Sequence, residues 1–256
     1  MAVHPVAALL DDVAAGRFPE PDGSVTILPQ PSPRYAGVFA FTAHSVVFAD
    51  ADPAWIRDML PPGDLSAPML PPFLQALSAR TGRRVNSIDM LCVAAPLAGL
   101  APLKLSPRSV HGPGAPRSVH NLGSTLSHGS AGPPSPAGPP SPGRPHSPGR
   151  VTADAGHPRV ARAMRYRTEV RAWQAPGGVV VIGRGVAGRW EAAIEVDPGG
   201  RGRGLGRKLA TAARHLVPDG APVWAQIAPG NAASVRTFLA AGFAPVGGEA
   251  LLLLLA

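Results

Sequence analysis

Between Val196 and Leu216 the chain reads VDPGGRGRGLGRKLATAARHL, a run of glycine and arginine that leads directly into a helical pattern. Glycines let backbone N–H groups turn toward one point, and a helix start adds unsatisfied N–H groups and a partial positive charge. Arg201, Arg203 and Arg207 add full positive charges. A disordered Gly/Arg segment is disfavoured because ordered patterns flank the run without a gap. The sequence therefore predicts a cradle for phosphates, and the absence of GKS or GKT argues against a nucleoside-triphosphate loop.

A second glycine pattern lies upstream, where VVVIGRGVAG places Gly183, Gly185 and Gly188 in the GxGxxG spacing of dinucleotide-binding folds. That fingerprint requires a helix to open at the third glycine, so that its N-terminus faces a pyrophosphate. Here the next residues are RWEAAIEVDP, which are strand-like and stopped by Pro198. We interpret these glycines as a hairpin turn.

The segments around both glycine clusters have regular periodicities. Asn231 is a natural N-cap for the last helix, and Gly242 lies just past its end. Together the segments predict the order β-β-β-α-β-α-β after a short helix. In chain order they are a basic helix over 157–167, strands over 169–174, 179–185 and 189–196, a helix over 205–216, a strand over 222–229, a helix over 231–241 and a strand over 243–255.

The stretch EVDPGGRGRGLGRKLATAARHL resembles the acyl-CoA-binding signature of the GNAT superfamily of N-acyltransferases, Arg/Gln-x-x-Gly-x-Gly/Ala. The signature falls on Arg201, Gly204 and Gly206. A later stretch, PGNAASVRTFLAAGF, is similar to a second motif of that family. The resemblance covers about residues 158–256. It implies an α/β (α+β) fold with a mixed, mostly antiparallel sheet and helices on both faces.

The resemblance also implies a cosubstrate and a reaction. Acetyl-CoA would bind where two neighbouring strands splay apart, and its acetyl group would pass directly to a primary amine. The acceptor amine is not readable from the sequence, and the resemblance leaves a homodimer open. The residues expected to bind acetyl-CoA are Glu195, Val196, Arg201, Gly202, Arg203, Gly204, Leu205, Gly206, Arg207 and Asn231.

The catalytic acid and base are where this sequence departs from the family. The position of a frequent tyrosine general acid holds Phe238, and the position of a glutamate found in some members holds Trp190. Glu191 and Glu195 lie nearby and share the strand face opposite Trp190, so each is a candidate base acting through water. The departures keep open an alternative, a catalytically silent CoA-binding module with a regulatory or interaction role.

Upstream, the chain divides by composition. Residues 1–105 predict a small mixed α/β segment, a candidate degenerate companion lobe, with strands within 36–50 and 87–97 and helices within 52–60 and 71–82. Residues 106–157 are rich in proline, glycine and serine and predict a disordered linker before the domain at 158–256. Linker histidines match no metal-ligand spacing, so no metal is expected. Lone His44 and Cys92 are interpreted as packing residues.

Charge and hydropathy limit the function classes. Residues 158–256 contain 13 basic and 6 acidic side chains, which account for most of the net charge of +8 and imply anionic partners. Nucleic acid is disfavoured as a partner because aromatic interleaving and RNA-binding signatures are missing. No stretch approaches the roughly 20 apolar residues needed to span a bilayer, and the N-terminus does not resemble a signal peptide. With a single cysteine and no membrane partner, the expected location is cytoplasmic.

Overall fold

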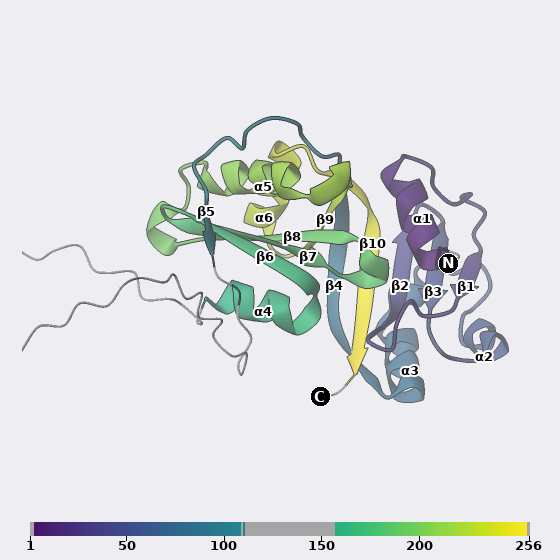
Figure 1. Cartoon of the computed structure of the whole chain (residues 1–256). Helices are drawn as coiled ribbons and strands as arrows, with labels where there is room; N and C mark the ends of the chain where they lie inside the picture. The colour runs from purple at the N-terminus through teal and green to yellow at the C-terminus, as the bar shows by residue number, and fades with distance from the viewer. Residues whose placement is uncertain (1–2, 109, 111–156, 255–256) are drawn as a thin grey trace, which may run out of the picture.

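The computed structural model describes residues 3–108, 110 and 157–254, and in this part of the chain ten strands form one sheet (Figure 1). Their order is β1-β3-β2-β10-β4-β9-β8-β7-β6-β5. Neighbours are antiparallel except in the β1–β3 and β8–β9 pairs. The predicted mixed, mostly antiparallel α/β fold is confirmed. The strands are β1 (Val25–Leu28), β2 (Tyr35–Phe41), β3 (His44–Phe48), β4 (Arg83–Ala94), β5 (Ser106–Arg108), β6 (Thr168–Ala175), β7 (Gly178–Arg184), β8 (Trp190–Val196), β9 (Val223–Ile227) and β10 (Ala244–Leu254).

Six α-helices cover this sheet in the described residues. Their ends follow from local chemistry: Asn231 caps α6 by accepting from the Ser234 N–H at 3.1 Å, and Gly82 ends α3 in the left-handed region. Short 3₁₀ turns fill several connections. The helices are α1 (Pro5–Ala14), α2 (Pro53–Asp58), α3 (Pro71–Thr81), α4 (Pro158–Tyr166), α5 (Leu205–Leu216) and α6 (Ala232–Ala240), and the 3₁₀ turns are η1 (Ala67–Met69), η2 (Val186–Gly188), η3 (Pro198–Gly200) and η4 (Pro218–Gly220).

The C-terminal half carries helices on both faces of the β6–β7–β8 meander. Strand β7 is buried and free of polar side chains up to its last residue, Arg184, because both of its faces are covered. Val180 and Ile182 pack in the core beneath α5 and α6, whereas Val179 and Val181 pack with Val160 of α4 on the other face. Figure 1 shows α4 and α5 on opposite sides of these strands. The meander thus holds α4 and α5 in fixed positions on either side of the sheet.

The N-terminal half continues the same sheet. Strands β2 and β3 are buried on both faces, with Phe39 and Phe48 stacked at 4.7 Å between ring centroids on the side of α1. Val38 and Val47 point to the other face, into a core shared with α2 and α3. The burial of apolar side chains on both faces stabilises this half in the same way as the meander.

Strand β4 joins the two halves. It lies between β9 and β10 and is antiparallel to both, with Met90 opposite Ile227 on one side and Gly248 on the other. A segment from the N-terminal half is therefore an interior strand of the C-terminal half. The buried Cys92 on β4 packs in the same core as α5 and α6.

Most elements predicted from the sequence are confirmed, and three were missed. The strands and helices predicted after residue 157 match the observed order, and the GxGxxG glycines lie in the β7–β8 hairpin as expected. The missed elements are α1, β1 and β5. Strand β5 pairs with β6, so the first residues of the predicted linker belong to the sheet. Residues 111–156, which hold the rest of that linker, lie outside the described residues.

Candidate functional site

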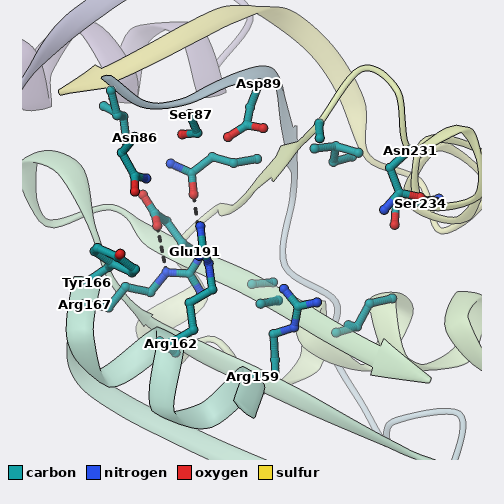
Figure 2. A pocket seen from close by; sticks show the side chains of 18 of the residues that line it. Asn86, Ser87, Asp89, Arg159, Arg162, Tyr166, Arg167, Glu191, Asn231 and Ser234 are labelled. Carbon is teal, nitrogen blue, oxygen red and sulfur yellow. Dashed lines mark hydrogen bonds and ion pairs between the residues drawn. The ribbon is translucent and has the colours of Figure 1, made fainter. Parts of the chain in front are cut away.

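Strands β8 and β9 diverge after a short parallel contact. They pair only at Trp190–Val223 and Glu191–Trp224, after which β8 continues to Val196 with no pairing to β9. The β9-facing edge of β8 beyond Glu191 is therefore open to an external hydrogen-bonding partner. A pocket of about 700 Å³ lies at this divergence, between α4, β4, β8, β9 and the start of α6 (Figure 2).

The glycine-rich loop follows β8 and ends at the first residue of α5. Gly202 and Gly204 have φ values of 73° and 78°, a region that favours glycine, and a Cβ at either position would meet no atom within 4 Å. The first backbone bond of α5 runs from the Lys208 N–H to the Gly204 carbonyl at 3.2 Å. The amides between these two residues precede that bond, so the helix start has N–H groups without an intrahelical partner, which is an arrangement that suits an anion.

The other members of the loop have different surroundings. Arg201 donates from Nε to the Val196 carbonyl at 3.3 Å, which ties the loop to the end of β8. A Cβ at Gly206 would lie 3.3 Å from Thr237 of α6, so this glycine allows α5 and α6 to approach closely. Arg203 and Arg207 are exposed. The loop and Val196 lie outside the lining of the 700 Å³ pocket.

A ring of charged and polar side chains lies at the buried end of the pocket, and three of its members, Arg167, Glu191 and Gln226, line the pocket. Arg167 donates from Nε to Glu191 at 2.8 Å, and Arg189 donates to Glu191 at 2.9 Å and to both oxygens of Glu249 at 2.7 Å. Gln226 closes the ring, donating to Glu249 at 3.0 Å and accepting from Arg167 at 3.4 Å. Two guanidinium groups and two carboxylates thus compensate one another inside the sheet, as a buried charge requires.

The two carboxyl groups of this ring have opposite pKa shifts. Burial acts to raise the pKa of Glu191, but Arg189 and Arg167 outweigh it and hold that pKa below its usual value. Burial raises the pKa of Glu249, with Arg189 opposing the shift and the charge of Glu191 adding to it. Because both Glu191 oxygens accept from guanidinium groups, this side chain is held as an anion in a fixed position.

Helix α4 and the residue after it form one wall of the pocket. Arg159, at its start, donates to Glu195 of β8 at 3.2 Å, while Arg167, just past its end, binds Glu191. Arg162 lies between them, with its guanidinium 5.2 Å from the Tyr166 ring centroid. Three basic residues of α4 and the position just after it, Arg159, Arg162 and Arg167, thus line the pocket.

Strand β4 supplies a wall that sequence reasoning missed. Asn86, Ser87 and Asp89 line the pocket, and Asp89 is opposite Glu249 in the β4–β10 register. Asp89 is half-buried, and burial raises its pKa above the usual value. The available signal was the alternation of polar Ser87 and Asp89 with the apolar residues of this strand, although nothing in it indicated which strands would be neighbours.

The predicted site residues fall in two adjoining places. Glu191, Glu195 and Asn231 line the pocket, whereas the loop from Arg201 to Arg207 surrounds the start of α5. Phe238 also lines the pocket and packs edge-on against Phe243, 4.9 Å between ring centroids. It brings no hydroxyl to the position where the family resemblance expects one.

Gly185 lies in the β7–β8 hairpin, directly against the side chain of Glu191. A Cβ at this position would lie 2.1 Å from the Glu191 carboxyl carbon, so only glycine leaves room for the buried carboxylate. Val186 donates its N–H to the same carboxylate at 3.4 Å. The second glycine of the pattern that resembles a dinucleotide fingerprint therefore accommodates Glu191.

Other candidate residues lie apart from this pocket. His44 bonds Asp22 at 3.0 Å and Thr26 at 2.9 Å near β1, and Cys92 is a fully buried thiol whose pKa burial raises to about 11. His157 caps α4, while the other linker histidines lie outside the described residues. Among the residues that the structure describes, no cluster of three or more His, Cys, Asp or Glu could hold a metal ion. No helix in that part of the chain is long and apolar enough to cross a membrane.

Comparison with known proteins adds a family match. Residues 168–243, from β6 to just past α6, match the model of the acetyltransferase (GNAT) family. A solved structure of a GCN5-related N-acetyltransferase from Kribbella flavida matches at 13% identity, with a TM-score of 0.35. That match covers 70% of this chain and 62% of the other, so this chain spans less than two thirds of its length. No curated protein sequence matches.

Proposed function

We propose that this protein transfers an acetyl group from acetyl-CoA to a primary amine, because residues 168–243 match the model of the acetyltransferase (GNAT) family. The observation that carries the proposal is the divergence of β8 and β9 beside a glycine-rich loop at the start of α5. An open strand edge suits the amide-bearing pantetheine arm, and a helix start with free N–H groups suits a pyrophosphate.

The residues present fit acetyl-CoA as a substrate. In this proposal Glu195 and Val196 lie beside the pantetheine arm, and Asn231 approaches from the start of α6. The pyrophosphate occupies the open space next to Gly202 and Gly204. Arg201, Arg203 and Arg207 place positive charges around the pyrophosphate. The backbone amides come from the whole loop, which is Arg201, Gly202, Arg203, Gly204, Leu205, Gly206 and Arg207.

The reaction is a direct transfer in a ternary complex. The amine nitrogen attacks the thioester carbonyl, a C–N bond forms and the C–S bond breaks. The nitrogen gives up one proton, and the CoA sulfur leaves as a thiolate that gains one. Holding the two reactants together can supply several kcal/mol of the acceleration, of order 7–11 for well-oriented reactants.

The two candidate bases differ in their surroundings. Glu191 is a poor proton acceptor because both of its oxygens are engaged by guanidinium groups and its pKa is lowered. We therefore propose that Glu191 positions Arg167 and the last turn of α4. Glu195 is half-exposed, with one partner in Arg159, and remains a candidate base.

A silent acyl-CoA-binding module is the second candidate, and Phe238 is the observation that favours it. Without a hydroxyl at that position, protonation of the leaving thiolate would fall to water. We also propose that residues 1–105 act as a companion to the transferase domain and residues 106–157 as a linker. A cytoplasmic location and a homodimer remain predictions.

Amine-dependent thiol release distinguishes the two candidates. With acetyl-CoA and a panel of primary amines, the enzyme releases free CoA thiol at a rate that depends on amine concentration. The Gly204→Asp variant places a carboxylate in the space of the pyrophosphate and should lose this activity at least about 10-fold. Gly63→Asp is the matched control, since Gly63 has a φ of 77°, no atom within 4 Å of its Cβ and a place remote from the pocket. Release that is independent of every amine contradicts the enzyme assignment.

A further inference from the structure

Not all of the charged side chains that line the pocket form ion pairs with one another. Six charged side chains line it, three basic and three acidic, and four of them form ion pairs within the chain. Arg159 binds Glu195, and Arg167 binds Glu191. The two that remain are Arg162 and Asp89, one of each sign.

Arg162 and Asp89 belong to opposite walls. Arg162 is on α4, and Asp89 is on β4; Figure 2 shows them approaching the pocket from opposite sides. The positive charge of Arg162 acts on the Asp89 carboxyl electrostatically, yet no ion pair joins these two residues in the described structure. A gap between two uncompensated opposite charges is complementary to a ligand that carries both charges.

We propose that the acceptor is a zwitterion, an amine that also bears a carboxylate, whose ammonium group binds Asp89 and whose carboxylate binds Arg162. This inference rests on the proposed acetyl transfer and names the acceptor class for the same site. Amino acids and short peptides with a free N-terminus and C-terminus belong to this class. Plain alkylamines and internal lysine side chains do not.

The surroundings of each group suit its partner. Arg162 is at the exposed mouth of the pocket, where its guanidinium can present two parallel N–H groups to a carboxylate. Asp89 is deeper, and the side chains near it are Ser87 on its own strand, Glu249 on β10, Glu191 on β8, and Arg189 just before β8. A buried ammonium requires an anion at hydrogen-bond distance, and Asp89 is the lining carboxylate without a guanidinium partner.

Asp89 also provides a destination for the proton that the ammonium must lose. The first proton moves from the ammonium nitrogen to the Asp89 carboxylate, which later releases it to solvent. The neutral amine attacks the thioester carbonyl, the C–S bond breaks, and the second proton from nitrogen ends on the CoA thiolate. Burial raises the pKa of this carboxyl above its usual value, which improves it as a proton acceptor near neutral pH. Atoms and charges balance with acetyl-CoA and the amine as the only reactants.

The test compares each carboxylate-bearing amine with its own carboxamide. Thiol release from acetyl-CoA is measured with α-amino acids, β-alanine, γ-aminobutyrate and dipeptides, beside the carboxamide of each and alkylamines of matched length. We expect the best carboxylate-bearing amine to exceed its carboxamide by about 10- to 100-fold in kcat/KM, the range of one charge-assisted contact.

Two variants assign the two contacts. Arg162→Gln should lower kcat/KM for the carboxylate-bearing amine by about 10- to 100-fold and so remove its preference over the carboxamide. Arg165→Gln is the matched control, because Arg165 lies on the same helix, 5.6 Å from the same Tyr166 ring centroid, but does not line the pocket. Asp89→Asn, close in size to the native side chain, should lower kcat for every amine and leave acetyl-CoA binding intact.

The outcomes separate this inference from the proposed function. Equal turnover of amino acids and carboxamides, or an Arg162→Gln variant that keeps the preference, overturns the zwitterion assignment and leaves the acetyltransferase standing. Unchanged kcat in Asp89→Asn overturns the role of Asp89. Acetyl-CoA binding without thiol release from any amine contradicts both, and a failure to bind acetyl-CoA contradicts the proposed function itself.

Discussion

At the scale of single residues, the carboxylates of the pocket are distinguished by their partners. Glu191 and Glu249 share Arg189 in the interior, whereas Asp89 faces the pocket without an ion-pair partner among the described residues. A buried carboxylate held by guanidinium groups orients its neighbours, and a half-buried one without such a partner is available to a ligand. The sequence predicted Glu191 as a candidate because of its strand face, but it could not show that Arg167 and Arg189 would engage it.

The buried ring predicts that replacing Glu249 lowers the free energy of unfolding much more than replacing the exposed Glu169. Glu249→Gln removes a 1% exposed carboxylate that binds Arg189 and should lower the free energy of unfolding by about 3 kcal/mol. Glu169→Gln, which breaks the exposed pair with Arg184, should cost less than about 1 kcal/mol. Urea unfolding followed by circular dichroism measures both. Equal effects would show that the ring does not stabilise the fold.

Cys92 provides a pH-dependent prediction. Its pKa of about 11 leaves about one thiol in a thousand ionised at pH 8, and the side chain is fully buried. A disulfide reagent should therefore label the native protein very slowly, with the rate rising as pH approaches 11, and label the urea-unfolded protein quickly. Fast native labelling at pH 8 would contradict the burial of this thiol. Slow labelling also keeps the thiol-release assay free of background.

At the scale of elements, the site depends on where the pairing between β8 and β9 ends. The β7–β8 hairpin holds Glu191 at the last β8–β9 pair, and the strand edge beyond it is open. Local patterns predicted the hairpin, the glycine loop and α5, since turn chemistry and helix periodicity depend on near neighbours. They did not predict β1 or β5, which are four and three residues long and have little periodicity to detect.

Replacing one hairpin glycine tests how closely the turn and the carboxylate fit. Gly185→Ala should destabilise the protein by roughly 1–3 kcal/mol, because its Cβ would overlap the Glu191 carboxyl group. Gly230→Ala is the control, at a position with φ outside the left-handed region and no atom within 4 Å of the added Cβ. Thermal and urea unfolding report both variants. A Gly185→Ala protein as stable as the control would mean that Glu191 moves without cost.

At the scale of the whole molecule, the pocket is shared between distant parts of the sequence. Strand β4 supplies Asn86, Ser87 and Asp89, although it lies more than 60 residues before α4. The segment at 87–97 was predicted as a strand from its composition, but its place between β9 and β10 depends on long-range pairing, which no local pattern encodes. The β4 residues of the pocket therefore could not be predicted from the sequence, whereas the glycine-rich loop at the start of α5 could.

Dividing the chain tests this shared architecture. Residues 1–110 and 157–256 expressed together as two chains should co-purify, because β4 pairs with both β9 and β10. The 157–256 fragment alone should lack a cooperative unfolding transition, since the edges of β9 and β10 that face β4 lose their partners. A fragment that unfolds cooperatively and binds acetyl-CoA by itself would contradict this dependence.

The most direct test of the central claim is isothermal titration of acetyl-CoA into the wild-type protein, Gly204→Asp and Gly63→Asp. The account predicts micromolar binding that is kept in Gly63→Asp and weakened at least about 10-fold in Gly204→Asp, because only the latter places a carboxylate at the start of α5. Equal binding by all three proteins would contradict the assignment of the pyrophosphate to this loop. No binding by the wild-type protein would contradict the proposed function.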